Sequence, residues 1–335
     1  MGNSVRKDVK IKIFNDDLSL QEVKQSILKS KVNQDCDFLL FFDCTKSNMF
    51  YDGTSLHDIP KHFAKCNNHT LSNPYLLILD IMKQFPFHSN SNFYLYFFGT
   101  EKSDRSINKL DQIKYILNES NGLIEQKEYY NSLEELINGY TTAINVNNFF
   151  TGVPLNEMIE ESINHVKNKK KFTIVIILLN NIIKKYEKKE TIKLIKKLIE
   201  STNYPLEIIC IGVGKENYQL LEGFDKCDYN KLGISSKKLY KFEKNRRFDN
   251  FHVVILKKIV KRTLINKNIK DEIFRNMFVE VPQVYNYIQK KNIISYVPNI
   301  TNNKSDIDDL LINNNFTIKP RPSVMVIDLN DNLNL

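Results

Sequence analysis

Five short, largely apolar runs constrain the fold of this chain more than any other feature. They span residues 38–43, 93–98, 172–179, 206–211 and 251–256. A run that is apolar on both of its faces is typical of a central strand in a parallel sheet, because helices cover both sides of such a sheet. We therefore predict five buried strands.

Helical patterns lie between these runs. The first covers about residues 19–31, where Ser19 and Glu22 have the spacing of a capping box. Further helices are predicted over about residues 74–85, 133–140, 155–166, 190–201 and 271–290. Strands that alternate with helices predict an α/β fold, with a doubly wound, mostly parallel central sheet and helices on both faces. In such a sheet, ligands bind at the carboxyl ends of the strands where the strand order reverses.

The chain of 335 residues carries a formal net charge of +9, which predicts attraction to acidic proteins and anionic surfaces. Many of its lysines are concentrated in residues 167–171 and 184–197. We interpret them as solvated helix faces, with docking to an anionic membrane surface as the sharper alternative. We do not expect nucleic acid to be a partner, because a scattered lysine excess is common on solvated surfaces.

Cysteine usage and hydropathy favour a cytoplasmic protein. The five cysteines form an odd set without a C-x-x-C pair, so neither a disulfide framework nor a zinc site is expected. No apolar run reaches the roughly 18 residues that a membrane-spanning helix needs. The sequence begins Met1-Gly2, which makes Gly2 a candidate for myristoylation and plasma-membrane association, although Arg6 stands where Ser or Thr is usual.

The loop after the first apolar run carries the most suggestive chemistry. Asp43, Thr45 and Ser47 place a carboxylate and two hydroxyls at alternate positions. Hard oxygen ligands of this kind, completed by water, suit Mg²⁺. The alternative is that the three side chains only satisfy loop amides through local hydrogen bonds. Because the sequence contains no G-x-S-x-G, H-E-x-x-H or complete phosphate-loop motif, we do not expect an enzyme.

An ordered set of segments gives the chain a family resemblance. It resembles the copine-type von Willebrand factor A domain, and it is most similar to the version found in the RGLG branch of plant RING-domain ligases. The similarity covers roughly residues 15–290. The segments are Leu18-Ser-Leu-Gln-Glu-Val, Asp43-Cys-Thr-Lys-Ser-Asn48, Ser55-Leu-His57, Asn73-Pro-Tyr75, Phe97-Phe-Gly99, Ile211-Gly-Val-Gly214, Arg247-Phe-Asp-Asn-Phe251 and Glu280-Val-Pro-Gln283.

The resemblance implies a Rossmann-like domain with a metal-ion-dependent adhesion site for Mg²⁺ or Mn²⁺. Asp43, Thr45 and Ser47 match the first loop of that site. The family's later threonine corresponds to Thr151, unless Asn147 occupies that position instead. Asn180 stands where the family has an aspartate, so the site loses one negative charge and we expect weakened metal binding.

The resemblance also implies a function and a domain plan. We expect a non-enzymatic adaptor that binds protein partners through acidic peptide segments. Residues 1–15 would form a basic N-terminal segment, 16–295 the A domain and 296–335 a flexible tail. Neither C2 domains nor a RING finger are expected, since few residues precede the domain and no cysteine follows Cys227. The alternative function is a RING-less, substrate-recruiting or regulatory component of a ubiquitin-ligase pathway.

Overall fold

The computed structural model describes twelve stretches of the chain. They are residues 18–34, 36–49, 55–58, 73–98, 111–112, 116–117, 124–125, 129–144, 155–180, 188–214, 217–263 and 268–293. The predictions made for Gly2, Asn147, Thr151 and the tail at 296–335 lie outside these residues. Among the described residues, no helix is both long and apolar enough to cross a bilayer.

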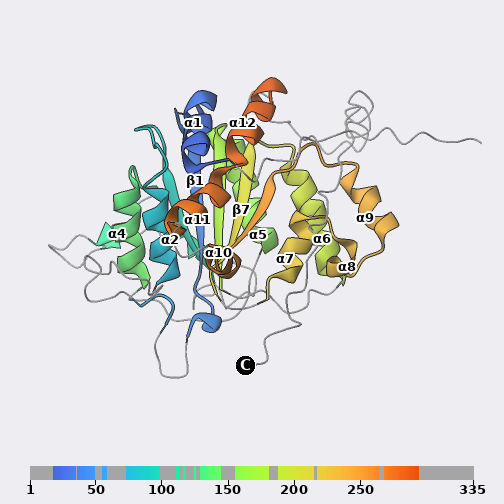
Figure 1. Cartoon of the computed structure of the whole chain (residues 1–335), viewed down its shortest axis with the longest axis horizontal. Coiled ribbons are helices and arrows are strands. Elements are labelled where there is room, and N and C mark those ends of the chain that lie inside the picture. Colours follow the sequence, from blue (N-terminus) through green and yellow to red (C-terminus); the bar gives the residue numbers. More distant parts are fainter. Residues whose placement is uncertain are drawn as a thin grey trace, which may run out of the picture.

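A six-stranded sheet forms the centre of the molecule (Figure 1). Its strands follow the order β3-β2-β1-β6-β7-β8. The bounds are β1 (Cys36–Asp43), β2 (Phe93–Phe98), β3 (Asp111–Gln112), β6 (Phe172–Leu179), β7 (Leu206–Gly212) and β8 (Phe251–Ile255). All neighbours pair in parallel except β3, which runs antiparallel to β2. The five predicted strands and the mostly parallel sheet are thus confirmed. A separate pair, β4 (Ile116–Leu117) and β5 (Ile124–Glu125), forms a small antiparallel sheet.

The strand order reverses between β1 and β6. The chain passes from β1 to β2 on one side and returns later to place β6 on the other side. Phe42 of β1 pairs with Phe97 of β2 and with Leu178 of β6, so the carboxyl ends of these strands lie at one edge. In doubly wound sheets this reversal opens a crevice where ligands bind. The predicted metal loop begins at this reversal, at the last residue of β1.

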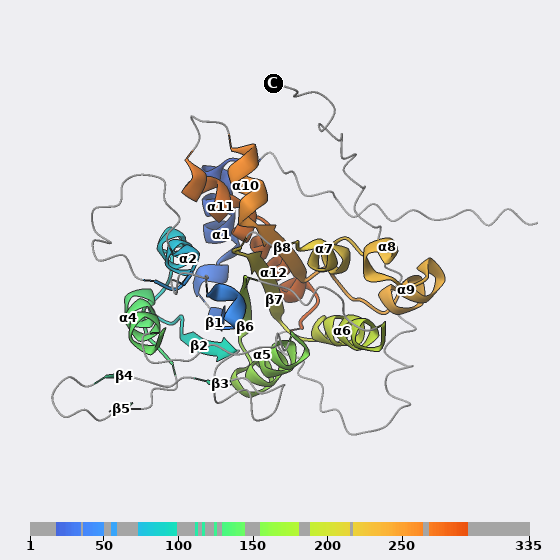
Figure 2. The ribbon, with the colours of Figure 1, turned by 90° about the horizontal axis from the view of Figure 1, so that it is seen from below.

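Helices cover both faces of the sheet (Figure 2). One face carries α1 (Leu20–Ser30), α2 (Pro74–Met82), α4 (Leu133–Ile144), α10 (Leu256–Arg262), α11 (Ile269–Phe278) and α12 (Val281–Lys290). The other carries α5 (Leu155–Lys169), α6 (Lys188–Ser201) and α7 (Gln219–Asp225), followed by α8 (Tyr229–Leu232) and α9 (Ser236–Glu243). Two short 3₁₀ turns, η1 (Val32–Gln34) and η2 (Lys46–Asn48), flank β1.

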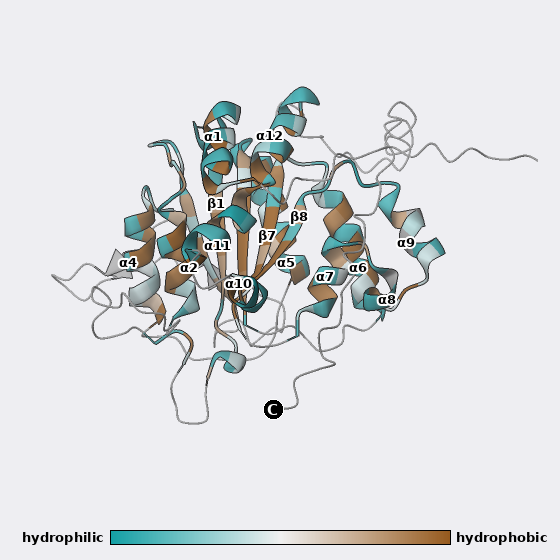
Figure 3. Cartoon of the chain, in the orientation of Figure 1, coloured by the Kyte–Doolittle hydropathy of each residue, from teal (hydrophilic) through white to brown (hydrophobic). Residues whose placement is uncertain are grey.

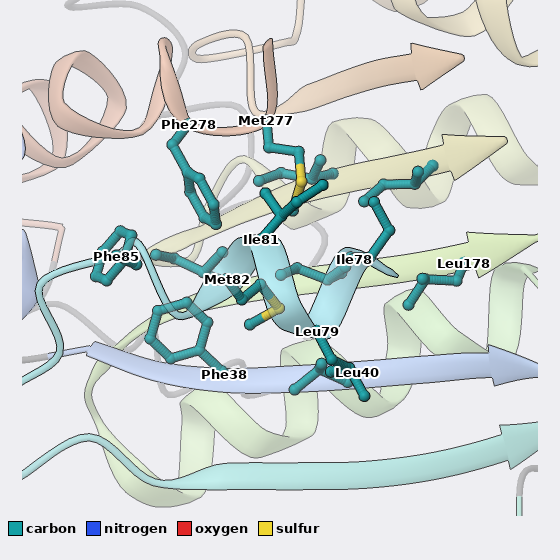
Figure 4. Packing of buried hydrophobic residues seen from close by; sticks show 14 of the residues in the cluster. Phe38, Leu40, Ile78, Leu79, Ile81, Met82, Phe85, Leu178, Met277 and Phe278 are labelled. Carbon is teal, nitrogen blue, oxygen red and sulfur yellow. The ribbon is translucent and has the colours of Figure 1, made fainter. Parts of the chain in front are cut away.

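Alternate residues of the strands supply two separate cores. In β1, Phe38, Leu40 and Phe42 face α2 and α11, while Leu39 and Phe41 face the opposite helices. Figure 4 shows Phe38 and Leu40 beneath the apolar side of α2, with residues of α11 closing the layer. Figure 3 shows the hydrophobic colour concentrated in the strands and the inner helix faces. This two-sided burial explains why the strands are continuously apolar in sequence.

The prediction of one continuous helix over residues 271–290 is wrong. The structure divides it into α11 and α12, with the break around Glu280. Pro282 lies in the first turn of α12, where its missing N–H costs nothing. In a continuous helix the same proline would remove a hydrogen bond and clash with the preceding turn. The capping box at Ser19 is confirmed, since Ser19 and Glu22 exchange both reciprocal hydrogen bonds.

A buried charge cluster anchors the amino-terminal end of β1. The carboxylate of Asp37 lies 2.8 Å from Lys171 Nζ and 3.2 Å from His165 Nε2. Burial raises the pKa of Asp37, but the hydrogen bonds and charges of His165 and Lys171 outweigh it and leave the pKa below its usual range. A carboxyl group whose pKa is lowered by folding stabilises the native state above its unfolded pKa of about 4, and that stability is lost as the pH falls further.

We expect Asp37→Asn to lower the free energy of unfolding at neutral pH by about 2 kcal/mol, since charge-assisted hydrogen bonds are weakened. The variant should also lose less stability than the wild-type chain below about pH 4, because its amide does not titrate. Urea unfolding at several pH values measures both effects. Glu134→Gln, at an exposed position of α4, is the matched control. Equal acid sensitivity of the wild type and Asp37→Asn would contradict the expectation.

Candidate functional site

The loop that leaves β1 is built around the carboxylate of Asp43, which is fully buried. The backbone N–H of Thr45 donates to Asp43 Oδ1 at 2.8 Å, and the backbone N–H of Asn180 donates to Asp43 Oδ2 at 2.9 Å. The first bond closes a turn inside the loop. The second joins the loop to the end of β6. Asp43 therefore ties together the two strands between which the strand order reverses.

Two hydroxyls lie beside this carboxylate. Thr45 Oγ1 and Ser47 Oγ are 2.7 Å apart and share a hydrogen bond. Thr45 is buried and Ser47 is half-buried, because the 3₁₀ turn η2 carries Ser47 outward. Oxygen ligands at neighbouring positions of an Mg²⁺ octahedron lie about 2.9 Å apart when metal–oxygen distances are about 2.0–2.1 Å. The spacing of the two hydroxyls is therefore compatible with adjacent positions around Mg²⁺.

Asn180 joins the two loops by its side chain as well as by its backbone. Its amide nitrogen Nδ2 donates to the backbone carbonyl of Ser47, and the residue is buried. The side-chain oxygen Oδ1 faces Gly214, where an added Cβ would come within 1.7 Å of it. Asn180 thus directs a donor group, not an oxygen ligand, toward the β1 loop. Its hydrogen bonds link the end of β6 to the β1 loop, the two segments that a bound metal would bridge.

Tyr218 joins the ends of β6 and β7 by hydrogen bonds of its hydroxyl group. Its hydroxyl lies 2.6 Å from the carbonyl oxygen of Asn180 and accepts from the backbone N–H of Gly214 at 2.9 Å. Gly212 and Gly214 allow this close approach, because a Cβ at Gly212 would lie 2.8 Å from the Tyr218 ring. The position of Asn180 therefore depends on the β7 end, which lies more than thirty residues further along the sequence.

A buried polar network supports the loop from the helix side. His57 Nε2 lies 2.7 Å from the carbonyl oxygen of Asp43, and His57 Nδ1 lies 2.8 Å from the hydroxyl of Tyr140. A carbonyl can only accept, so Nε2 carries the proton and Nδ1 accepts from Tyr140. Burial lowers the pKa of His57 to about 4, which keeps the ring neutral. Asn48 Nδ2 donates to the same Asp43 carbonyl at 2.9 Å, and Tyr75 donates to Asn48 Oδ1 at 2.6 Å.

The arrangement fits Mg²⁺ in ligand type and in the spacing of its two hydroxyls, but it supplies little charge. The oxygen ligands that the described part of the loop offers to a metal are one carboxylate and two hydroxyls, from Asp43, Thr45 and Ser47. No group of three or more His, Cys, Asp or Glu side chains suited to a metal ion occurs among the described residues. With an amide at Asn180, a divalent cation would face a single negative charge here, so its binding is expected to be weak.

The structure brings together four of the residues that the sequence indicated. Asp43, Thr45, Ser47 and Asn180 meet at the carboxyl ends of β1 and β6. Thr151 and Gly2 lie outside the described residues, so their roles stay predictions. The sequence reasoning missed the supporting residues. They are Asn48, Tyr75, Tyr140, Gly214 and Tyr218. The Ile211-Gly-Val-Gly214 segment was the available signal for the last two, since paired glycines at a strand end indicate a close approach.

Three comparisons relate the chain to known proteins. A family model described as Copine matches residues 55–296. Copine family protein 2 of Caenorhabditis elegans is 25% identical over 262 residues, which cover 76% of this chain but 3% of that protein. The SpRpn10 VWA domain is 11% identical and covers 73% of this chain and 96% of that domain, with a TM-score of 0.38. A von Willebrand factor type A structure from Catenulispora acidiphila is 14% identical. The match covers 73% of this chain and 42% of that one, with a TM-score of 0.35.

The family match begins at residue 55, downstream of the Asp43 loop, so it says nothing about the ligands in that loop. It does span the strands from β2 to β8 and the helices up to α12. The strand order β3-β2-β1-β6-β7-β8 is that of a doubly wound sheet, the fold class that the resemblance implied. The chain therefore belongs to the copine family, and its fold is that of a copine-type von Willebrand factor A domain.

Proposed function

We propose that this chain is a non-enzymatic interaction module that binds protein partners at the loops after β1 and β6. The observation that supports it most is the site at the reversal of strand order, where Asp43 is buried and Ser47 reaches the surface. Both ring nitrogens of His57 are engaged by Asp43 and Tyr140, so that histidine is not placed to activate a nucleophile. The described residues at these strand ends, Thr45, Ser47 and Asn180, offer polar groups for binding.

The proposed partner is an acidic peptide segment. Lys46 is exposed on η2, between the hydroxyls of Thr45 and Ser47, and the chain as a whole is basic. A partner carboxylate could therefore bind by charge and by hydrogen bonds from the hydroxyls. If Mg²⁺ is bound, Asp43, Thr45 and Ser47 would hold it, and the ion would offer a coordination position to the same carboxylate. Acidic partners are thus expected with or without the metal.

Two finer elements of the sequence-based hypothesis stay proposals. One is membrane association of a cytoplasmic protein through acylation of Gly2, which a single chain achieves only marginally. The other is a recruiting or regulatory role in a ubiquitin-ligase pathway, which the resemblance to RING-bearing relatives motivates. Both are compatible with an adaptor, because neither needs a catalytic residue at the carboxyl ends of the strands.

We expect the double variant Lys46→Glu/Ser47→Ala to lose most partners in a proximity-labelling experiment in the native cell. Reversal of the charge at Lys46 and loss of the Ser47 hydroxyl should reduce labelling of true partners by about tenfold or more. Both side chains reach the surface, so folding should be preserved, which circular dichroism can check. Glu134→Ala on α4, at an exposed position on a different element, is the matched control. An unchanged partner list for the double variant would overturn the proposed binding surface.

A further inference from the structure

Helix α9 presents an exposed aromatic side chain surrounded by lysines. Tyr240 is 70% exposed, the largest exposed fraction among the large hydrophobic side chains of the described residues. Lys237 and Lys244 lie three residues before and four residues after it, so all three share one face of the helix. Both lysines are exposed. This outward face is called the α9 face below.

The opposite side of α9 fixes the helix on the body of the protein. Phe242 is half-buried and packs against the core that covers α6. Lys196 of α6 lies over the Phe242 ring at 5.8 Å, so the exposed lysine side of α6 continues into α9. The α9 face therefore points away from the protein, and Figure 1 shows α9 at the outer edge of the molecule, away from β1.

The positive charge of this region is only partly neutralised. Glu243 of α9 is engaged by the buried Arg246 at 3.1 Å, and Glu200 of α6 pairs with Lys197 at 3.0 Å. Glu190 is the other acidic residue of α6, and it stands next to Lys188 and Lys189 in the sequence. Lys237, Tyr240 and Lys244 themselves include no acidic residue, and the carboxylate of Glu243, three residues after Tyr240, is held by Arg246, so the α9 face attracts anions.

We propose that the α9 face docks onto an anionic lipid bilayer, as a second binding surface separate from the loops after β1 and β6. A tyrosine has an apolar ring and a polar tip, which suits it to the interfacial layer of a membrane. Lysines around it can extend their chains along apolar surface and hold their ammonium groups at the lipid phosphates. Charge and amphipathic aromatic character thus coincide on one protruding helix face.

Two features favour a membrane over nucleic acid. Single-stranded nucleic acid is bound in basic grooves where several aromatic rings stack successive bases. The α9 face instead has one exposed ring on a convex helix, with lysines and no arginine. A diffuse layer of anionic headgroups needs neither a groove nor the fixed geometry of arginine forks. The lysines of α6 would add to the attraction between the protein and the anionic headgroups. No exposed aromatic side chain accompanies them on the described residues of α6.

The test uses the full-length chain made in bacteria without acylation, so Gly2 does not contribute an anchor. It is sedimented with vesicles of phosphatidylcholine alone or mixed with phosphatidylserine. We expect binding only to the mixed vesicles, and weaker binding as salt is raised. Each lysine removed from the face should weaken partitioning by about fivefold, so Lys237→Gln/Lys244→Gln should lose about twenty-five-fold. Lys29→Gln/Lys290→Gln, at exposed positions of α1 and α12, removes the same charge elsewhere and should change little.

A fluorescence readout tests the aromatic group directly. The chain contains no tryptophan, so Tyr240→Trp introduces a single reporter at the centre of the face. We expect its emission to shift to the blue when mixed vesicles are added, because the indole leaves water for the interface. Tyr240→Ala should bind more weakly than the wild type. Equal loss of binding in both double-lysine variants, an unshifted emission of the Tyr240→Trp variant with bound vesicles, or tighter binding to a single-stranded oligonucleotide than to the vesicles would each overturn the proposal.

Discussion

Replacing Asn180 by Asp is expected to strengthen Mg²⁺ binding by about ten- to a hundredfold. A second carboxylate beside Asp43 adds a negative charge at the ends of β1 and β6, and its attraction for a divalent ion at a few ångström amounts to several kcal/mol before desolvation is subtracted. The same change should destabilise the metal-free protein by about 1–3 kcal/mol. It replaces the amide donor to the Ser47 carbonyl by an acceptor, and it places two carboxylates close together.

Thermal unfolding with and without Mg²⁺ separates these two effects. Asn180→Asp should unfold below the wild-type chain in EDTA, and its melting temperature should rise more with added Mg²⁺ because the ion binds only the native state. Asn180→Ala is the control, since it removes the same amide bond to Ser47 without adding charge. It should be destabilised without gaining a metal response. An identical Mg²⁺ response in the wild type and Asn180→Asp would contradict the assignment of this position to the metal site.

The strands were the most predictable part of the fold. Each strand is apolar on both faces because helices cover both faces of the sheet, so the runs at β1 and β6 stand out in the sequence. The segment from α7 to α9 was not predicted. Its helices have four to eight residues and are interrupted by turns, so no apolar period repeats often enough to be recognised. The exposed Tyr240 of α9 was missed for the same reason.

The site was predictable in its ligands but not in its connections. Asp43, Thr45 and Ser47 are close in sequence, and alternation after a strand is a local property that residues alone can indicate. The role of Asn180 as a link to Ser47 is not local, because the two residues are 133 positions apart. Sequence comparison with the family indicated a lost charge at Asn180. The hydrogen bonds that Asn180 makes instead depend on how closely the end of β6 approaches the β1 loop. Only the packing of the sheet determines that distance.

Gly214 should tolerate no side chain, and Gly214→Ala is expected to be the most damaging small substitution at the site. An added Cβ would lie 1.7 Å from Asn180 Oδ1 and 2.8 Å from the Asn180 backbone oxygen. The side-chain contact could be relieved by moving the amide away from the Ser47 carbonyl, but the backbone oxygen also accepts from Tyr218 at 2.6 Å and is fixed by the strand. We expect a loss of about 3 kcal/mol, as in other overpacked cores.

A double-mutant cycle assigns this loss to its cause. In Gly214→Ala/Asn180→Ala the contact with the side-chain oxygen is absent, so the second substitution should cost less in the Gly214→Ala background than in the wild type. Chemical denaturation of the four proteins gives the coupling energy. Gly233→Ala is the matched control, because Gly233 has a positive φ of 64° but no atom within 4 Å of an added Cβ, and it should lose only the strain of about 1–2 kcal/mol. Additive losses for Gly214 and Asn180 would mean that the two residues do not act on each other. The contact with Gly214 would then have no part in holding the Asn180 amide against the β1 loop, and only the backbone bonds through Tyr218 would connect the β7 end with Asn180.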